Sequence, residues 1–283
     1  MSIRAPLRNL LKTSRTWAAS RRMHTVPDIG LKQSAGLPGL LSPKGLDIAW
    51  FEYQAYVVSK VNQLLEKHPE YNKTADMFEL MTQAQASPDP EVKELAVFAS
   101  QAFNNEFFFR TLRPSVNPNA VVGPSTNKLN VDISTEVLNR PELALPATPV
   151  PGQLPLADLN EIIEQSFDSV VSMRELLINR ADAMFGNGYV WLVYHMSVLS
   201  AVNTYNWASP YSHEDMFSEQ GDGSIAELDQ SRIKSFAPIL CINAWEHVYL
   251  HDYGVAGKRE YLRNLFDCLD WKVIISRLPA RSY

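Results

Sequence analysis

The chain has 283 residues, of which 46% are hydrophobic and 20% are charged, and its formal net charge is −5. This composition is ordinary for a globular protein, and no stretch approaches the roughly 20 consecutive apolar residues that a membrane span needs. The two cysteines, Cys241 and Cys268, lie in apolar segments without CxxC spacing, which argues against a disulfide framework and fits a reducing compartment.

Residues 1–27 differ from the rest of the chain because they contain six basic residues and no acidic one. The basic residues are Arg4, Arg8, Lys12, Arg15, Arg21 and Arg22. Such a segment, with interspersed serines and a basic amphipathic pattern, is typical of a mitochondrial transit peptide. We therefore expect import into the mitochondrial matrix and cleavage just after Arg22. The alternative is a basic arm that binds nucleic acid or lipid.

The charge of the chain changes once this segment is set aside. Of the 26 Lys and Arg residues, 20 follow residue 27, as do all 31 Asp and Glu residues, which gives a net charge near −11. A strongly acidic protein is a poor general binder of phosphate backbones. The sequence predicts no membrane partner and leaves room only for limited contact with nucleic acid.

The N-terminal half is predicted to be helical. Residues 28–45 are rich in Gly, Pro and Ser and are predicted to be an extended leader. Apolar residues then recur at spacings of three and four from Leu46 to His68, before Pro69. A second helix is predicted from about Val92 to Leu112, so residues 46–115 are expected to form a helical hairpin domain.

Eight prolines between residues 113 and 156 exclude long regular elements, and residues 116–156 are predicted to be a linker. A helix is predicted over 157–185, at the start of a C-terminal α/β domain, 157–283.

Three strands are predicted at 189–194, 197–204 and 236–243, followed by helices at about 245–253 and 258–270. Residues 208–235 contain six acidic residues and read as an exposed acidic insertion. The predicted fold class is α+β, with an N-terminal helical hairpin followed by a small three-stranded antiparallel sheet and flanking helices.

Four segments occur in an order that is typical of one known family. They are Asn243–Tyr249 with Asp252–Tyr253, Phe185–Leu192, Ala102–Phe109 and Tyr261–Trp271. The first, NAWEHVY, closely resembles the signature Asp-x-Trp-Glu-His-Ala-Tyr of the iron/manganese superoxide dismutases. The resemblance extends over residues 40–278 and implies the two-part dismutase fold.

The resemblance also implies where a metal site would lie. The family binds one metal ion through three His and one Asp. The matching positions here are Ile48 or Ala49 (the register is uncertain by one residue), Asn105, Asn243 and His247, so only His247 retains a ligand. We therefore expect no catalytic residues, no cofactor and no metal at these degenerate positions. Four other histidines have no ligand-like spacing, although His247 and His251 are i and i+4.

Trp245, Glu246 and His247 are expected at a dimer interface, because in the family this Glu reaches the metal-binding His of the partner. The alternative is that Glu246 stands at the N-terminus of a helix, where its negative charge interacts favourably with the helix dipole, and that His247 is a core residue. Leu250 stands where the family has an interface Tyr, and Glu52 or Tyr53 where it has a His. A non-identical partner therefore fits better than a second copy.

A degenerate dismutase with a transit peptide resembles the fungal mitochondrial small-subunit ribosomal proteins that derive from this fold. The resemblance implies a structural, non-enzymatic role in mitochondrial translation, with mitochondrial ribosomal proteins as partners and a heterodimer with a related dismutase-like chain. The alternatives are an inactive subunit of another mitochondrial complex and an active metal-dependent dismutase.

Overall fold

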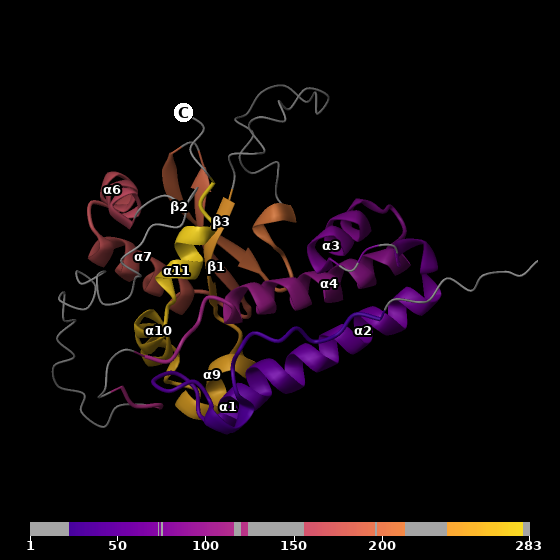
Figure 1. Cartoon of the computed structure of the whole chain (residues 1–283), viewed down its shortest axis with the longest axis horizontal. Coiled ribbons are helices and arrows are strands. Elements are labelled where there is room, and N and C mark those ends of the chain that lie inside the picture. The colour runs from indigo at the N-terminus through magenta and orange to yellow at the C-terminus, as the bar shows by residue number, and fades with distance from the viewer. Residues whose placement is uncertain are drawn as a thin grey trace, which may run out of the picture.

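The computed structural model describes residues 23–72, 74, 76–115, 120–123, 156–195, 197–212 and 237–279 (Figure 1). The predictions for the transit peptide, for most of the linker 116–156 and for most of the acidic insertion 208–235 therefore lie outside the described residues.

Helices make up the N-terminal half. They are α1 (Pro43–Leu46), a π-helical segment (Asp47–Glu52), α2 (Tyr53–Lys67), the 3-10 turn Pro69–Tyr71, α3 (Met77–Ala86) and α4 (Pro90–Phe109). Figure 1 shows α2 and α4 side by side, with α3 packed on α4. The two long helices were predicted, although the first begins as a short α-helix and a π-helical segment.

Helix α3 was missed, so the predicted two-helix hairpin is wrong in this detail. Asp76 caps α3 by accepting a hydrogen bond from the backbone N–H of Phe78, and Asp89 caps α4 in the same way through Glu91. Both residues are N-cap types, and Pro90 then fills the first position of α4. The leader 28–45 is also more ordered than predicted, because Leu37, Leu40 and Leu41 are buried in the core.

The C-terminal half begins with α6 (Leu156–Phe167) and α7 (Val170–Asp182). A single helix over 157–185 was predicted, and this is wrong because the chain breaks at Asp168. Asp168 has a φ of 67°, a left-handed conformation that Asp tolerates better than most residues. Ser169 then caps α7 by accepting a hydrogen bond from the backbone N–H of Ser172.

The sheet confirms the three predicted strands. They are β1 (Gly188–His195), β2 (Val198–Tyr205) and β3 (Ala237–Asn243), all antiparallel in the order β2-β1-β3. The central strand β1 is buried along almost its whole length.

Three helices follow the sheet: α9 (Glu246–Tyr253), α10 (Lys258–Asp267) and the unpredicted α11 (Trp271–Ser276). Helix α9 packs against α1 and the π-helical segment, and α4 packs against β3. The fold class is α+β, as predicted. In the part of the chain that the structure describes, no helix has the length and apolar character to cross a membrane.

Candidate functional site

Two of the degenerate ligand positions meet at the centre of the molecule. Asn105 lies near the end of α4 and Asn243 ends β3, and both side chains are fully buried. The Nδ2 group of Asn243 donates to Oδ1 of Asn105 at 3.4 Å. The packing of α4 on β3 therefore brings together residues that are far apart in the sequence.

A third buried amide, Gln54 on α2, completes this centre and was not singled out from the sequence. Asn105 Nδ2 donates to Gln54 Oε1 at 2.9 Å, and Gln54 Nε2 donates to the carbonyl of Ala102 at 3.0 Å. At the other end, Asn243 Oδ1 accepts from the backbone N–H of Trp245 at 2.9 Å. We call Gln54, Asn105 and Asn243 the amide network. It joins α2, α4 and β3 through uncharged hydrogen bonds.

The π-helical segment contributes a backbone carbonyl to the amide network. The carbonyl of Ala49 accepts a hydrogen bond from Asn105 Nδ2 at 3.4 Å, and Ala49 is fully buried. Ile48 is only partly buried. The carbonyl of Ala49 therefore belongs to the amide network. Neither the methyl group of Ala49 nor the aliphatic side chain of Ile48, the two residues considered for the remaining ligand position, can bind a metal.

His247 does not join the amide network. Its ring stacks on Tyr53 with the ring centroids 4.1 Å apart, and it meets Trp245 edge-on at 5.6 Å. Its Nε2 atom is buried and has no hydrogen-bond partner among the described residues. His251, four residues further along α9, is exposed. The one retained ligand is thus held in an aromatic cluster.

Large aromatic side chains surround the amide network. Trp191 is fully buried in β1, lies 5.2 Å from the ring of Phe107, and donates from Nε1 to Thr204 Oγ1 at 2.9 Å. The ring of Tyr189 lies between those of Trp191 and Trp245, at 5.8 Å and 6.3 Å. Tyr189 pairs with Asn243 across the sheet and Trp245 follows Asn243 by two residues, so this aromatic cluster adjoins the amide network.

These residues do not fit the metal that the family implies. Iron and manganese need imidazole or carboxylate donors, whereas two of the positions hold neutral amides. Asn105 uses its NH₂ group on Gln54 and Ala49, and the side-chain oxygens of both asparagines already accept hydrogen bonds. Within the described ranges, no group of three or more His, Cys, Asp or Glu side chains could hold a metal ion.

His247 should make stability depend on pH. Burial lowers its pKa from 6.5 to about 4. Below pH 6.5 this histidine is protonated in the unfolded chain but stays neutral in the folded chain. The stability that depends on neutral His247 is therefore fully present at neutral pH and is lost as the pH falls from 6.5 to 4. The free energy of unfolding should therefore fall between pH 7 and pH 5. In His247→Phe we expect this fall to be smaller by about 2 kcal/mol.

This expectation is checked by urea unfolding at both pH values. The burial of His24 also lowers its pKa, so His24→Phe is the matched control for the share of the pH dependence that arises elsewhere. An unchanged pH dependence in His247→Phe would show that His247 can be protonated in the folded state.

Glu246 lies at the molecular surface at the start of α9. Its side chain is exposed, and its backbone N–H donates to Asn187 Oδ1 at 3.2 Å. Asn187 belongs to the turn before β1, in which Phe185 is 97% exposed. Among the described residues no ion pair is formed by the Glu246 carboxylate, and its helix begins beside the turn that carries the exposed ring of Phe185. Trp245 and His247, the other residues of the predicted interface, are largely covered by the chain itself.

Comparison with known proteins agrees with this geometry. The family model for the C-terminal domain of iron/manganese superoxide dismutases matches residues 155–277. The small ribosomal subunit protein mS43 of Schizosaccharomyces pombe is 30% identical over 259 residues, which cover 90% of this chain and 84% of that protein. The small ribosomal subunit protein mS42 of the same organism is 27% identical over 69% of this chain and 71% of its own length.

An authentic dismutase is also similar, at a lower level. The chloroplastic iron superoxide dismutase 3 of Arabidopsis thaliana is 23% identical over 84% of this chain and 69% of that protein. The fold and the degenerate centre thus define a dismutase-like protein whose ligand positions are mostly neutral. The chain belongs to the iron/manganese superoxide dismutase-like family that includes the small ribosomal subunit protein mS43.

Proposed function

We propose that this chain is a structural component of the small subunit of the mitochondrial ribosome and acts as a non-catalytic scaffold. The observation that carries the proposal is the similarity to mS43 across nearly the whole chain. The amide network supports it, because a core closed by neutral hydrogen bonds is held together without a metal.

The same proposal places the protein in the mitochondrial matrix. Residues 1–27, with six basic residues and no acidic one, are proposed to be the import signal. His24 is held by two hydrogen bonds to Asn62, from His24 N to Oδ1 at 2.8 Å and from Nδ2 to His24 O at 2.9 Å. Because the chain is packed into the fold from His24 onward, we place the cleavage site before His24.

Sedimentation of mitochondrial lysates tests the ribosomal role. We expect the chain to migrate with the small ribosomal subunit and to remain there at low ionic strength. N-terminal sequencing of the bound form should show the loss of the first 20 to 23 residues. A chain that stays in fractions free of ribosomal proteins would favour an inactive subunit of a different mitochondrial complex.

Metal analysis tests the absence of catalysis. We expect purified protein to contain far less than one iron or manganese per chain and to show no superoxide-dismuting activity, because the donor set is neutral. An authentic dismutase purified in parallel is the control. About one metal ion per chain together with activity would instead establish that the protein is an active metal-dependent dismutase.

We also propose that the chain pairs with a related dismutase-like protein. Two such proteins, mS43 and mS42, occur in one organism, and both are similar to this chain. The exposed Glu246 and Phe185 form the surface that we assign to the pairing. The net charge near −11 beyond residue 27 supports attachment to the ribosome mainly through proteins, with limited rRNA contact.

A further inference from the structure

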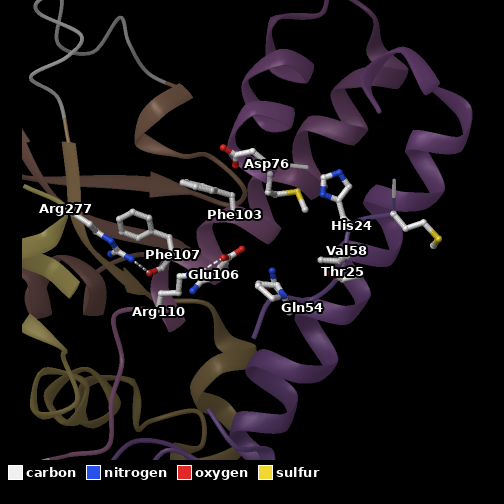
Figure 2. A pocket seen from close by; sticks show the side chains of 13 residues that line it. His24, Thr25, Gln54, Val58, Asp76, Phe103, Glu106, Phe107, Arg110 and Arg277 are labelled. Atoms are coloured by element: carbon white, nitrogen blue, oxygen red, sulfur yellow. Dashed lines mark hydrogen bonds and ion pairs between the residues drawn. The ribbon is translucent and has the colours of Figure 1, made fainter. Parts of the chain in front are cut away.

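A pocket of about 370 Å³ lies between the N-terminal segment, α2, α4 and the end of α11. Figure 2 shows Arg277 and Arg110 on its C-terminal side and His24, Thr25 and Val58 on the side of α2. The pocket is separate from the exposed surface around Glu246. Its lining combines apolar side chains with four charged ones, and the balance of those charges indicates what it binds.

Both carboxylates of the pocket are already compensated. Glu106 Oε1 accepts from Arg110 Nε at 2.6 Å, one turn along α4. Asp76 accepts from the backbone N–H of Phe78 at the N-terminus of α3, where the helix dipole favours a negative charge. Neither carboxylate is therefore left to neutralise another cation.

Arg277 is the uncompensated charge. It donates from Nη1 to the carbonyl of Ile239 at 3.2 Å and from Nη2 to the carbonyl of Phe107 at 3.1 Å. Its guanidinium carbon lies 3.5 Å above the Phe107 ring. Burial and the nearby Arg110 lower its pKa to about 10, so it is cationic at neutral pH. In the described part of the chain, no carboxylate lies within ion-pair distance of it.

We infer that this pocket binds a segment of a neighbouring protein in which a carboxylate side chain is adjacent to an apolar one. The carboxylate pairs with Arg277, because a partly buried cation without a counter-ion is costly and an anion removes that cost. The apolar side chain packs against Met77, Val58 and Phe103, which line the same pocket. His24, whose buried Nε2 has no hydrogen-bond partner in the part of the chain that the structure describes, offers one further polar contact.

A protein segment fits better than a nucleotide for two reasons. The chain beyond residue 27 is strongly acidic, which disfavours a phosphate backbone. Aromatic faces for base stacking are also already taken. Arg277 covers Phe107, and Phe103 packs with the rings of Phe78, Phe107 and Tyr211.

Methionine methyl NMR of the purified chain provides the test, because Met23 and Met77 line the pocket and Met173 is fully buried in the other half. The probes are the peptides Ac-Phe-Asp-Phe-NH₂ and Ac-Phe-Asn-Phe-NH₂, which differ only in charge, and uridine 5′-monophosphate. We expect the Asp peptide to shift the Met77 methyl and to bind about tenfold tighter than the Asn peptide, the size of one charge-assisted hydrogen bond. Met173 should not respond.

Variants assign the effect to Arg277. Arg277→Lys should keep the preference for the Asp peptide, and Arg277→Met should abolish it. Arg180→Met, which also removes a guanidinium bonded to a backbone carbonyl, should leave the preference intact. If Arg277→Met is unfolded, Arg277→Gln, which removes the charge but keeps hydrogen-bond donors for the carbonyls of Ile239 and Phe107, carries the same test. Equal binding of both peptides, tighter binding of the nucleotide, or no response of Met77 would each overturn the inference, and none of these results depends on whether the chain is ribosomal.

Discussion

Asn105→Leu is expected to lower the free energy of unfolding by about 2–4 kcal/mol. The substitution removes the hydrogen-bond partner of Gln54 Oε1 and of Asn243 Nδ2, both of which bond to Asn105 in a fully buried centre. A buried polar atom that loses its partner costs more than a hydrogen bond contributes when it is present. The measurement is urea unfolding followed by circular dichroism.

The double variant sharpens this prediction. Replacing both Gln54 and Asn105 by Leu removes both ends of the strongest hydrogen bond, so its cost should be clearly smaller than the sum of the two single costs. Gln83→Leu is the matched control, because this exposed glutamine bonds only to Glu79 on the surface of α3. A cost for Asn105→Leu within about 0.5 kcal/mol, the usual range for surface changes, would show that the amide network does not stabilise the fold.

Glu246→Leu is expected to weaken pairing with the related dismutase-like chain by about 3–5 kcal/mol, the usual cost of breaking a buried charge pair. Glu246 is exposed in the isolated chain, so the loss should appear in the affinity between the two chains and leave the unfolding free energy unchanged. Glu246→Gln keeps a hydrogen-bonding side chain and should weaken pairing less.

The affinity is measured by calorimetric titration of one purified chain with the other. Glu66→Leu, which replaces another exposed glutamate near the end of α2, is the control and should pair normally. Phe185→Ser should also weaken pairing, because this ring is 97% exposed near Glu246. Normal pairing by Glu246→Leu, or an assembly in which this surface faces solvent, would exclude the proposed interface.

The sequence predicted the parts of the fold that have strong local signals. The three strands were predicted correctly because Tyr189–Tyr194 and the neighbouring strands are rich in β-branched and aromatic residues. Helix α4 was predicted because Asp89 and Pro90 are typical of a helix N-terminus. The break at Asp168 was missed because it depends on one residue in a left-handed conformation within a continuous apolar pattern. Helix α11 was missed because it is only six residues long.

The candidate site was predicted only in part, for a similar reason. Motif comparison located Asn105, Asn243 and His247, but a motif names only the positions that a family uses for metal binding. Gln54 has no counterpart in that set, and its role arises from a hydrogen bond to Asn105, 51 positions away. A buried glutamine in an otherwise apolar helical stripe is a signal that could have indicated such a partner.

The π-helical segment Asp47–Glu52 has a consequence for any attempt to rebuild a metal centre in this protein. The backbone N–H of Tyr53 bonds to the carbonyl of Ile48, five residues back, so the segment holds one residue more than an α-helix would in the same turn. An alignment that treats the segment as a regular α-helix therefore places the residues on one of its two sides out of register by one. The position of a histidine introduced at Ile48 or Ala49, relative to Asn105, depends on this extra residue. An attempt to restore the ligand must therefore consider the length of the turn as well as the substitution.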